Sequence, residues 1–378
     1  MLRVLFVFGT RPEAIKLAPV IARLREQPAQ FATRVAVTAQ HRDLLDQVLD
    51  AFGIRPDHDL NLMRPGQSLF ESSARILAAL EPVLAEERPD WVLVQGDTTT
   101  AFCGALAAFY AGVRVGHVEA GLRTGDPRQP FPEEMNRVLI TRLAAMHYAP
   151  TAEAAGNLAR EGIPAESMLV TGNTGIDAVL EVRDRLAAGS LHAGPLPRLD
   201  PSRKLILVTA HRRESFGAGF ENICAALARL AARADVEIVY PVHPNPNVRE
   251  PVRRVLGGLS NVHLIDPVEY VSFVELMRRA HILLTDSGGI QEEAPSLGKP
   301  VLVMREKTER PEAVAAGTAR LVGTHADRIV AECVELLDDA EGYARRARIH
   351  NPYGDGRAAI HIREHLLSTS PAITTVSV

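Results

Sequence analysis

The segment Thr285–Pro300 combines a turn of the kind that binds phosphate with a carboxylate at helical spacing. It follows the apolar run Ile282–Leu284, which predicts a buried strand, and its later residues predict a short helix. The Ser287-Gly-Gly289 turn would then present backbone N–H groups to an anion, and glycine allows a phosphate to approach closely. Glu293, less than two helical turns further on, is suitably spaced to accept hydrogen bonds from a ribose. The pattern predicts a nucleoside diphosphate site, although the motif alone is also typical of an ordinary helix start.

Three carboxylates in the N-terminal half are candidates for acid–base chemistry. Asp97 follows the apolar run Trp91–Gln95, Glu119 follows Val113–Val118, and Glu133 falls in the first turn of a predicted helix. Carboxylates that share a site raise one another's pKa values, which suits proton transfer near neutral pH.

Structural roles remain open for some of these residues. Asp97 is equally suited to be the N-cap of a helix at Thr99–Ala111. Glu133 and Glu134 both suit the positive end of a helix dipole, and we favour that role for Glu134 and a catalytic role for Glu133. Glu119 leaves a predicted strand into a Gly-containing loop, where no capping role is evident.

Basic residues lie at or near several of the predicted strand ends. The candidates are Arg11, Lys16 and Arg137 in the N-terminal half, and His211, Arg212 and Arg310 in the C-terminal half. A diphosphate or a leaving group could meet Arg11, Lys16, His211 or Arg212, although Lys16 fits a solvated helix start equally well. Arg137 could balance the charge of the carboxylates, and Arg310 would lie close by. His243 fits a loop held by flanking prolines at least as well as a site. No metal-ligand spacing, G-x-G-x-x-G after the first strand or P-loop motif occurs, which argues against a metal site, a dinucleotide redox enzyme and a P-loop ATPase.

Apolar strand-like runs alternate with amphipathic helical stretches along the chain. The first series of predicted strands is Val4–Phe8, Arg34–Thr38, Trp91–Gln95, Val113–Val118 and Met168–Thr171. The second series is Leu205–Thr209, Glu237–Tyr240, Val262–Ile265, Ile282–Thr285 and Val301–Met304. This alternation is typical of parallel sheets covered by helices, which bind ligands at the carboxyl ends of their strands. It predicts an α/β protein with two doubly wound, Rossmann-like domains that face each other across a cleft.

A Gly- and Pro-rich segment at 189–203 predicts a linker between the two domains. We therefore expect an N-terminal domain at 1–188, which would carry the candidate carboxylates. A nucleotide-binding domain is expected at 204–356, followed by a C-terminal helix and tail at 357–378.

The composition is that of an ordinary soluble globular protein. The 378 residues are 46% hydrophobic and 23% charged, with a net charge of −4, so neither nucleic acid nor a membrane surface is indicated as a partner. Three scattered cysteines, Cys103, Cys224 and Cys333, predict core thiols and a cytoplasmic location. No apolar run approaches the ~20 residues of a membrane span, and Met1–Phe8 is too short for a signal peptide.

Taken in order, the polar motifs closely resemble those of the non-hydrolysing UDP-N-acetylglucosamine 2-epimerases of bacteria. The matching segments are Phe8–Lys16, Gln40-His41, Gly96–Thr100, Gly116–Gly125, Pro132-Glu-Glu134, Thr171-Gly-Asn-Thr174, His211–Ser215, Asp286–Lys299 and Glu309–Glu312. The resemblance extends from Val4 to about Gly356 without a departure at a motif position.

This resemblance implies a glycosyltransferase-B-type fold, a homodimer, and interconversion of UDP-GlcNAc and UDP-ManNAc without a cofactor or metal. UDP would be eliminated and re-added through a 2-acetamidoglucal intermediate, and the product would supply precursors of cell-surface polysaccharide. The implied catalytic residues are Asp97, Glu119, Glu133 and His211. The implied substrate-binding residues are Arg11, Lys16, Asp97, Glu119, His211, Val268 and Phe273 at the uridine, Ser287, Gly288 and Gly289 at the phosphates, Glu293 at the ribose, and Arg310. A second UDP-GlcNAc would bind an allosteric site at Gln40, His41, Arg212 and His243.

Other functions remain open on the residues alone. A glycosyltransferase of the same fold would share the nucleotide site, and a hydrolysing 2-epimerase would release free N-acetylmannosamine. A non-catalytic nucleotide-sugar binder would need no catalytic carboxylates. The three carboxylates favour the epimerase, because a transferase needs at most one base.

Overall fold

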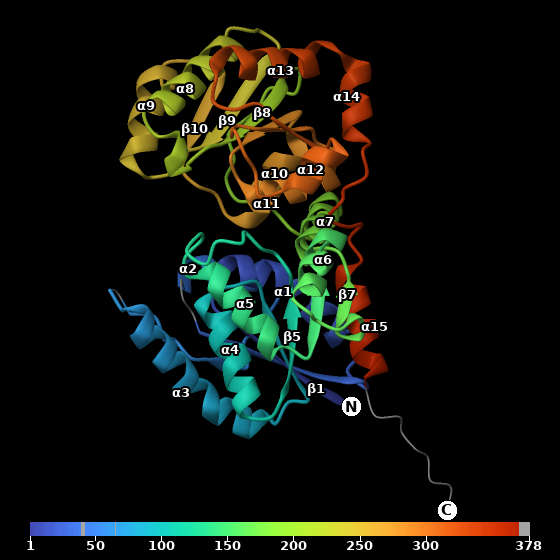
Figure 1. Ribbon diagram of the computed structural model, residues 1–378. Helices are drawn as coiled ribbons and strands as arrows, with labels where there is room; N and C mark the ends of the chain where they lie inside the picture. The colour runs from blue at the N-terminus through green and yellow to red at the C-terminus, as the bar shows by residue number, and fades with distance from the viewer. Residues whose placement is uncertain (39–41, 65, 370–378) are drawn as a thin grey trace, which may run out of the picture. The chain divides into compact units, whose positions relative to one another are not determined.

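The computed structural model describes residues 1–38, 42–64 and 66–369, which belong to two compact units. The first unit comprises Met1–Ala178 together with Tyr353–Val378, and the second comprises Val179–Pro352. Each unit is built around its own parallel β-sheet (Figure 1).

The first unit has a seven-stranded sheet in the order β3-β2-β1-β4-β5-β6-β7. Its strands are β1 (Leu2–Phe8), β2 (Phe31–Val37), β3 (His58–Asp59), β4 (Trp91–Gln95), β5 (Arg114–Val118), β6 (Met146–Ala149) and β7 (Met168–Val170). Its helices are α1 (Arg11–Arg25), α2 (Arg42–Ala51), α3 (Leu69–Glu87), α4 (Thr99–Tyr110), α5 (Glu133–Leu143), α6 (Ala152–Arg160), α15 (Ala358–Ser368) and the start of α7 (Thr174–Ala187). Helix α4 packs between α3 and α5, and α1 packs between α2 and α15 (Figure 1).

The second unit has a six-stranded sheet in the order β10-β9-β8-β11-β12-β13. Its strands are β8 (Lys204–Thr209), β9 (Val236–Pro241), β10 (Val262–Ile265), β11 (Ile282–Thr285), β12 (Val301–Val303) and β13 (Ala319–Leu321). Its helices are α8 (Ala218–Ala231), α9 (Pro246–Leu256), α10 (Tyr270–Arg279), α11 (Gly288–Glu293), α12 (Pro311–Ala316), α13 (Ala326–Asp338), α14 (Ala340–Ala347) and the end of α7. Helix α8 packs between α9 and α13 over a core that includes Ile206, Phe220 and Leu227, all fully buried.

Both sheets are Rossmann-like, and the strand order reverses at an equivalent place in each. In the first unit the reversal lies between β1 and β4, and in the second it lies between β8 and β11. A crevice opens at such a reversal, outside the carboxyl ends of the two strands. The turns and helix starts that follow these four strands carry Arg11, Asp97, His211, Arg212 and Ser287.

The predicted strands are all present, and three of them, Trp91–Gln95, Val262–Ile265 and Ile282–Thr285, have the predicted bounds. The short strands β3, β6 and β13 were not predicted. Strand β6 has a histidine in an otherwise strand-like run, and His147 is buried with its ring nitrogens 2.9 and 3.0 Å from the carbonyl oxygens of Ser167 and Thr141. Those partners lie outside β6, so the short run by itself did not indicate that a buried histidine would find hydrogen-bond partners in this strand.

The division into units differs from the predicted boundaries. The chain passes between the units at Ala178–Val179, inside α7, and again at Pro352–Tyr353. The segment 189–203, predicted to be a linker, belongs to the second unit, where Gly194 N donates to Ser272 Oγ at 2.9 Å and Asp200 N donates to Glu237 Oε2 at 2.8 Å. The C-terminal helix α15 belongs to the first unit, since it packs against α1.

Asp177 attaches α15 to the first unit, and we expect this attachment to depend on pH. Its carboxylate accepts hydrogen bonds from Ala359 N at 2.9 Å and Ala358 N at 3.2 Å. Burial raises the pKa of Asp177 to about 6, while these backbone donors oppose the rise. A carboxyl whose folded-state pKa is raised stabilises the fold below its unfolded pKa, and this contribution is lost as pH rises through the folded pKa. The unfolding free energy should therefore fall by up to about 3 kcal/mol between about pH 4 and pH 6 because of this group.

Fluorescence of Trp91 can follow this change, because it is the only tryptophan and its ring lies edge-on to His365 of α15, with ring centroids 6.3 Å apart. Denaturant titrations should be compared for the native chain and Asp177→Asn across this pH range. The difference between the two curves isolates Asp177 from other titrating groups. Parallel pH dependences in the two proteins would contradict the expectation.

Candidate active site

The first crevice begins at the turn between β1 and α1. A Cβ atom on Gly9 would lie 2.1 Å from Thr38 Oγ1 and 2.7 Å from Thr100 Oγ1, so only glycine fits there. Arg11 is the first residue of α1 and is half-buried, and its side chain makes no hydrogen bond or ion pair with any other residue that the structure describes. This leaves its guanidinium available to a ligand.

Glu13 joins this turn to the one that follows β4, a role that the sequence analysis missed. Its buried carboxylate accepts from Gly9 N at 3.1 Å and Thr10 N at 2.8 Å through one oxygen, and from Thr98 Oγ1 at 2.7 Å through the other. Burial raises the pKa of Glu13 above its ordinary value, and these donors oppose the rise. The Thr-x-x-Glu spacing of a capping box was the available signal, but it indicates a helix start and not a link between two turns.

Glu119 lies directly after β5 in a left-handed conformation, with φ +64°. Such backbone is uncommon for a residue with a side chain and is often found at functional sites. One carboxylate oxygen accepts from Lys16 Nζ at 2.5 Å and from Asn173 Nδ2 at 3.4 Å, and the other accepts from Gln95 Nε2. The side chain is only 6% exposed, so these partners hold a desolvated carboxylate in one orientation.

Asp97 follows β4 and does not cap the next helix. The N-cap of α4 is Thr98, whose hydroxyl accepts from Ala101 N at 3.0 Å. The Asp97 side chain is 27% exposed and pairs with Arg137 at 2.5 Å. Burial raises the pKa of Asp97 above its ordinary value; the positive charge of Arg137 opposes this rise, and the negative charge of Glu119 adds to it. Glu119 therefore raises the pKa of Asp97, as expected for neighbouring carboxylates, but by less than burial does.

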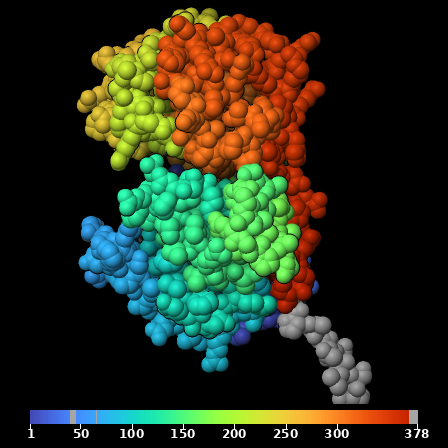
Figure 2. All heavy atoms as spheres, viewed as in Figure 1, coloured from blue at the N-terminus to red at the C-terminus, as the bar shows by residue number. Residues whose placement is uncertain are grey.

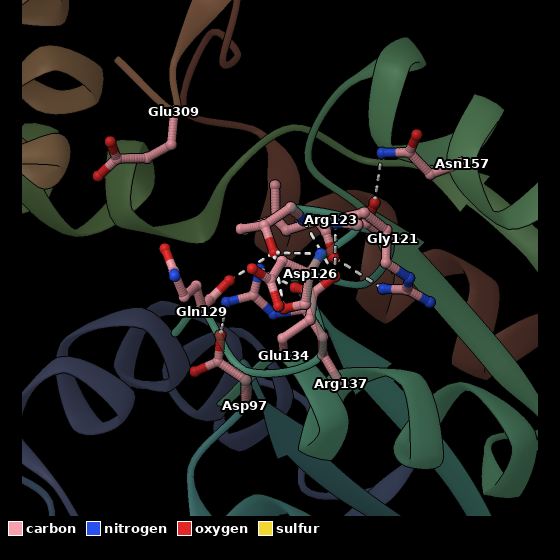
Figure 3. A network of polar contacts seen from close by, with 12 residues as sticks. Asp97, Gly121, Arg123, Asp126, Gln129, Glu134, Arg137, Asn157 and Glu309 are labelled. Carbon is pink, nitrogen blue, oxygen red and sulfur yellow. Dashed lines mark hydrogen bonds and ion pairs between the residues drawn. The ribbon is translucent and has the colours of Figure 1, made fainter. Parts of the chain in front are cut away.

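The two adjacent glutamates at the start of α5 differ in their surroundings. Glu134 is buried and takes part in the polar network around Asp97, which includes Arg137 (Figure 3). Glu133 is half-buried, and its side chain has no hydrogen-bond or ion-pair partner among residues 1–38, 42–64 and 66–369. A role for Glu133 in catalysis stays a prediction. For Glu134 we favoured an interaction with the helix dipole, and that role does not account for the contacts it makes.

His117, in the middle of β5, also supports this crevice. Its Nε2 is 2.7 Å from the carbonyl oxygen of Gly96, the residue before Asp97. Complete burial lowers the pKa of His117 to about 3. The ring is therefore neutral at physiological pH, and the contact to a carbonyl places its proton on Nε2. We missed this residue because a histidine in an apolar run has no local signature of such a contact.

In the second unit, His211 follows β8 and is held by Asp286, which follows β11. The Asp286 carboxylate accepts from His211 N at 2.6 Å and from Arg212 N at 2.7 Å, and its other oxygen is 3.3 Å from His211 Nδ1. Asp286 is 1% exposed whereas the His211 side chain is 47% exposed. A buried carboxylate therefore orients the imidazole at Nδ1, and the exposed remainder of the ring is open to a ligand.

The two candidate allosteric residues of this unit lie in the same cluster as His211. The ring of His243 stacks on that of His211, with centroids 5.6 Å apart and planes 14° apart. Arg212 donates to the backbone oxygen of Asp286 at 3.0 Å and to Glu309 Oε1 at 2.7 Å. A cavity of about 540 Å³ is lined by His211, Arg212 and His243, and also by Ser287. The other two candidates, Gln40 and His41, lie outside the described residues.

Ser287 follows β11 as the N-cap of the short helix α11, and Gly288 and Gly289 are the first residues of that helix, so the predicted strand-to-helix turn is present. A Cβ on Gly288 would be 3.3 Å from Glu309 Oε1 and 3.7 Å from Arg310 Cζ, so the candidate arginine lies beside the turn. Arg310 is itself held by an ion pair to Glu292, which is buried. Backbone N–H groups and a fixed guanidinium next to a glycine form a suitable environment for a phosphate.

The remaining candidates are spread over neighbouring elements. Glu293 ends α11, and one of its carboxylate oxygens would be 3.9 Å from a Cβ on Gly289. Val268 lies in the loop before α10 and Phe273 lies on that helix, and both are half-buried. Their positions agree with the order of elements around the turn, but nothing in the structure assigns them to a uridine.

Several broader features of the described chain bear on the site. Among the residues that the structure describes, no group of three or more His, Cys, Asp or Glu side chains is arranged to hold a metal ion. Within the same residues, no helix has the length and hydropathy needed to cross a membrane. The three cysteines are free and fully buried, which confirms that they are core thiols.

A family model described as UDP-N-acetylglucosamine 2-epimerase matches residues 22–367. The chain belongs to this family. The UDP-N-acetylglucosamine 2-epimerase of Salmonella typhimurium strain LT2 is 58% identical over 372 residues, which cover 97% of this chain and 99% of the relative. The enzyme is therefore an isomerase, as the resemblance of its motifs implied.

Solved structures agree with this family and with the fold. The crystal structure of the Neisseria meningitidis UDP-GlcNAc 2-epimerase, bound to UDP-GlcNAc, is 50% identical with a TM-score of 0.87, covering 97% of this chain and 100% of that one. The glycotransferase of kitacinnamycin is 15% identical with a TM-score of 0.60, covering 96% and 98% of the two chains, so it shares the fold alone. The predicted fold class, two parallel-sheet domains of glycosyltransferase-B type, is confirmed.

Proposed function

We propose that the enzyme interconverts UDP-N-acetylglucosamine and UDP-N-acetylmannosamine by eliminating and re-adding UDP. The observation that carries the proposal is the pair of carboxylates, Asp97 and Glu119, which follow the neighbouring strands β4 and β5 and are fixed by Arg137 and Lys16. The Neisseria relative, bound to UDP-GlcNAc, supports the choice of substrate.

The chemistry requires the departure of UDP because the hydrogen on C2 of the sugar is not next to a carbonyl. A carboxylate takes the C2 proton, the electrons of that bond form a C1=C2 double bond, and the C1–O bond breaks with its pair remaining on UDP. The intermediate is 2-acetamidoglucal. Return of UDP to C1 and of a proton to the opposite face of C2 completes the inversion.

The residues of the two units suit different parts of this reaction. Carboxylates of the first unit supply the base and the acid. In the second unit, His211, Arg310 and the turn Ser287–Gly289 stabilise the charge that develops on the diphosphate, and Glu293 accepts from the ribose. Arg11 adds a further positive charge for the leaving group.

Incubation with UDP-GlcNAc alone in deuterated water tests the proposal. We expect UDP-ManNAc with deuterium at C2, detected by NMR and mass spectrometry. Free sugar and UDP as the accumulating products would instead identify a hydrolysing epimerase. The absence of both C2 exchange and product would contradict catalysis of either kind and favour a transferase or a binder.

A homodimer is part of the same proposal. Helix α3 lies at the surface of the first unit in Figure 2. It begins with the exposed side chains Leu69 and Phe70, and Phe70 is 88% exposed. Phe109 and Tyr110 at the end of α4 are also exposed, and Tyr110 lines a groove of about 750 Å³ with residues of α3. Apolar side chains of this size are typical of an interface, and sedimentation equilibrium would measure the mass in solution.

Three further expectations from the resemblance belong to this proposal. A second UDP-GlcNAc would activate the enzyme near Arg212 and His243, which sigmoidal kinetics would reveal. The product would supply precursors of cell-surface polysaccharide, and the location would be cytoplasmic. Loss of surface polysaccharide in a deletion strain and fractionation of the cells would test these two expectations.

A further inference from the structure

The start of helix α5 contacts the Asp97 turn in two ways. Asn136 Nδ2 donates to the backbone oxygen of Asp97 at 2.9 Å, and Arg137 Nη2 donates to Asp97 Oδ2 at 2.5 Å. The other terminal nitrogen of Arg137 is 3.2 Å from Glu134 Oε2 (Figure 3). A single guanidinium, only 12% exposed, therefore spans two carboxylates.

Glu134 is itself fixed by the loop that follows β5. Its Oε1 accepts from Thr124 N and from Gly125 N, both at 3.0 Å. A carboxylate that served only a helix dipole would gain little from burial, yet Glu134 is 3% exposed. Two backbone donors and one ion pair compensate for that burial, and together they leave Glu134 little freedom.

The charges that face Asp97 come from three elements. Arg137 on α5 and Lys16 on α1 favour its ionised form, whereas Glu119 at the end of β5 disfavours it. Burial disfavours the ionised form most strongly, and so the pKa of Asp97 is raised despite the two cations. Of the two cations, only Arg137 contacts Asp97 directly, because Lys16 pairs with Glu119.

We propose that Arg137, anchored by Glu134, is a positioning residue that orients the Asp97 carboxylate and keeps it charged for the reaction. The inference rests on the proposed function, in which Asp97 works as a carboxylate. It goes beyond that function by assigning a role to two residues that the proposed reaction does not itself use. Glu134, and not the preceding Glu133, is then the member of the pair that supports Asp97.

Three variants test this inference through the pH dependence of turnover. Arg137→Met removes the cation that favours ionised Asp97, so the pKa of Asp97 should rise further and the acidic limb of kcat/KM should move to higher pH. We expect kcat near pH 7 to fall about 10- to 100-fold and to recover partly at higher pH. Arg137→Lys retains the charge without the two-pronged contact, so its acidic limb should stay near that of the native enzyme while kcat falls by a smaller factor.

Glu134→Gln separates the ion pair with Arg137 from the hydrogen bonds to the loop at Thr124 and Gly125. Glutamine keeps an oxygen for Thr124 N and Gly125 N but loses the charge opposite Arg137. We expect kcat to fall about 10-fold with KM little changed, because the Arg137 side chain is no longer held. If Glu134 serves only to hold the loop, kcat should be unchanged in this variant. Arg142→Met, on the exposed face of the same helix, is the matched control and should behave as the native enzyme.

The outcomes separate this inference from the proposed function. Absence of C2 exchange in the native enzyme would contradict the proposed function itself. Native exchange, together with loss of exchange in Asp97→Asn, an unshifted pH profile in Arg137→Met and normal kcat in Glu134→Gln, would overturn the inference alone. Trp91 fluorescence reports whether each variant folds. If Arg137→Met does not fold, native-like kcat in both Arg137→Lys and Glu134→Gln still overturns the inference.

Discussion

Asp97→Asn and Glu119→Gln are each expected to lower epimerisation about 10²–10⁴-fold, the range for loss of a general acid or base. Deuterium incorporation at C2 should fall together with epimerisation if the lost group is the base. Both amides retain the size of the side chain, and Asp97→Asn removes no helix cap because Thr98 caps α4. Folding should therefore survive in both variants, and Trp91 at the start of β4 provides a fluorescence check.

Glu133→Gln completes this series and separates two interpretations of Glu133. If Glu133 is the C2 base, exchange and epimerisation are lost in this variant. If it only interacts with the dipole of α5, the change costs at most ~1 kcal/mol of stability and leaves turnover intact. Glu153→Gln, an exposed glutamate paired with Arg160 on α6, is a suitable control. Native-like exchange in all three variants would remove the acid–base mechanism even if the nucleotide site is correct.

His211→Ala is the second change with a large expected effect. The loss of one preorganised donor to a developing charge typically lowers turnover roughly 10²–10³-fold. Asp286→Asn should lower turnover by a smaller factor, since it weakens the support of the imidazole and leaves the imidazole in place. Steady-state kinetics with UDP-GlcNAc measure both effects.

Arg11→Ala should resemble His211→Ala, because both remove a group assigned to the departing diphosphate. His325→Ala, an exposed histidine at the N-cap of α13 with no capping hydrogen bond, is the matched control and should be silent. Near-normal turnover in both His211→Ala and Arg11→Ala would exclude their assignment to the leaving group.

Much of the fold could be predicted because its local signals agree with its tertiary arrangement. Buried parallel strands are continuous apolar runs, and such runs marked ten of the strands close to their true bounds. The boundaries between the units could not be predicted in the same way. Glycine and proline at 189–203 indicate irregular backbone, but whether such a segment links two units or packs on one depends on contacts such as Asp200 with Glu237.

The candidate residues for contact with a ligand were easier to predict than the residues that support them. Asp97, Glu119 and His211 are polar residues directly after apolar strands, which is a local signal. Glu13, His117 and Asp286 support them through partners distant in the sequence, such as Thr98 for Glu13. A support of this kind depends on two elements being neighbours in the sheet, and the sequence of either element alone does not contain that information.

The family, the alternation of strands and helices, and the types of residue at the crevices follow from the sequence, because they depend on local composition and spacing. Which of two adjacent glutamates joins Asp97 follows only from the folded arrangement. Successive residues on a helix point about 100° apart, so the choice between Glu133 and Glu134 depends on how α5 is rotated against the sheet. Packing sets that rotation, and it turns Glu134 and Arg137 toward Asp97 and the loop at Thr124.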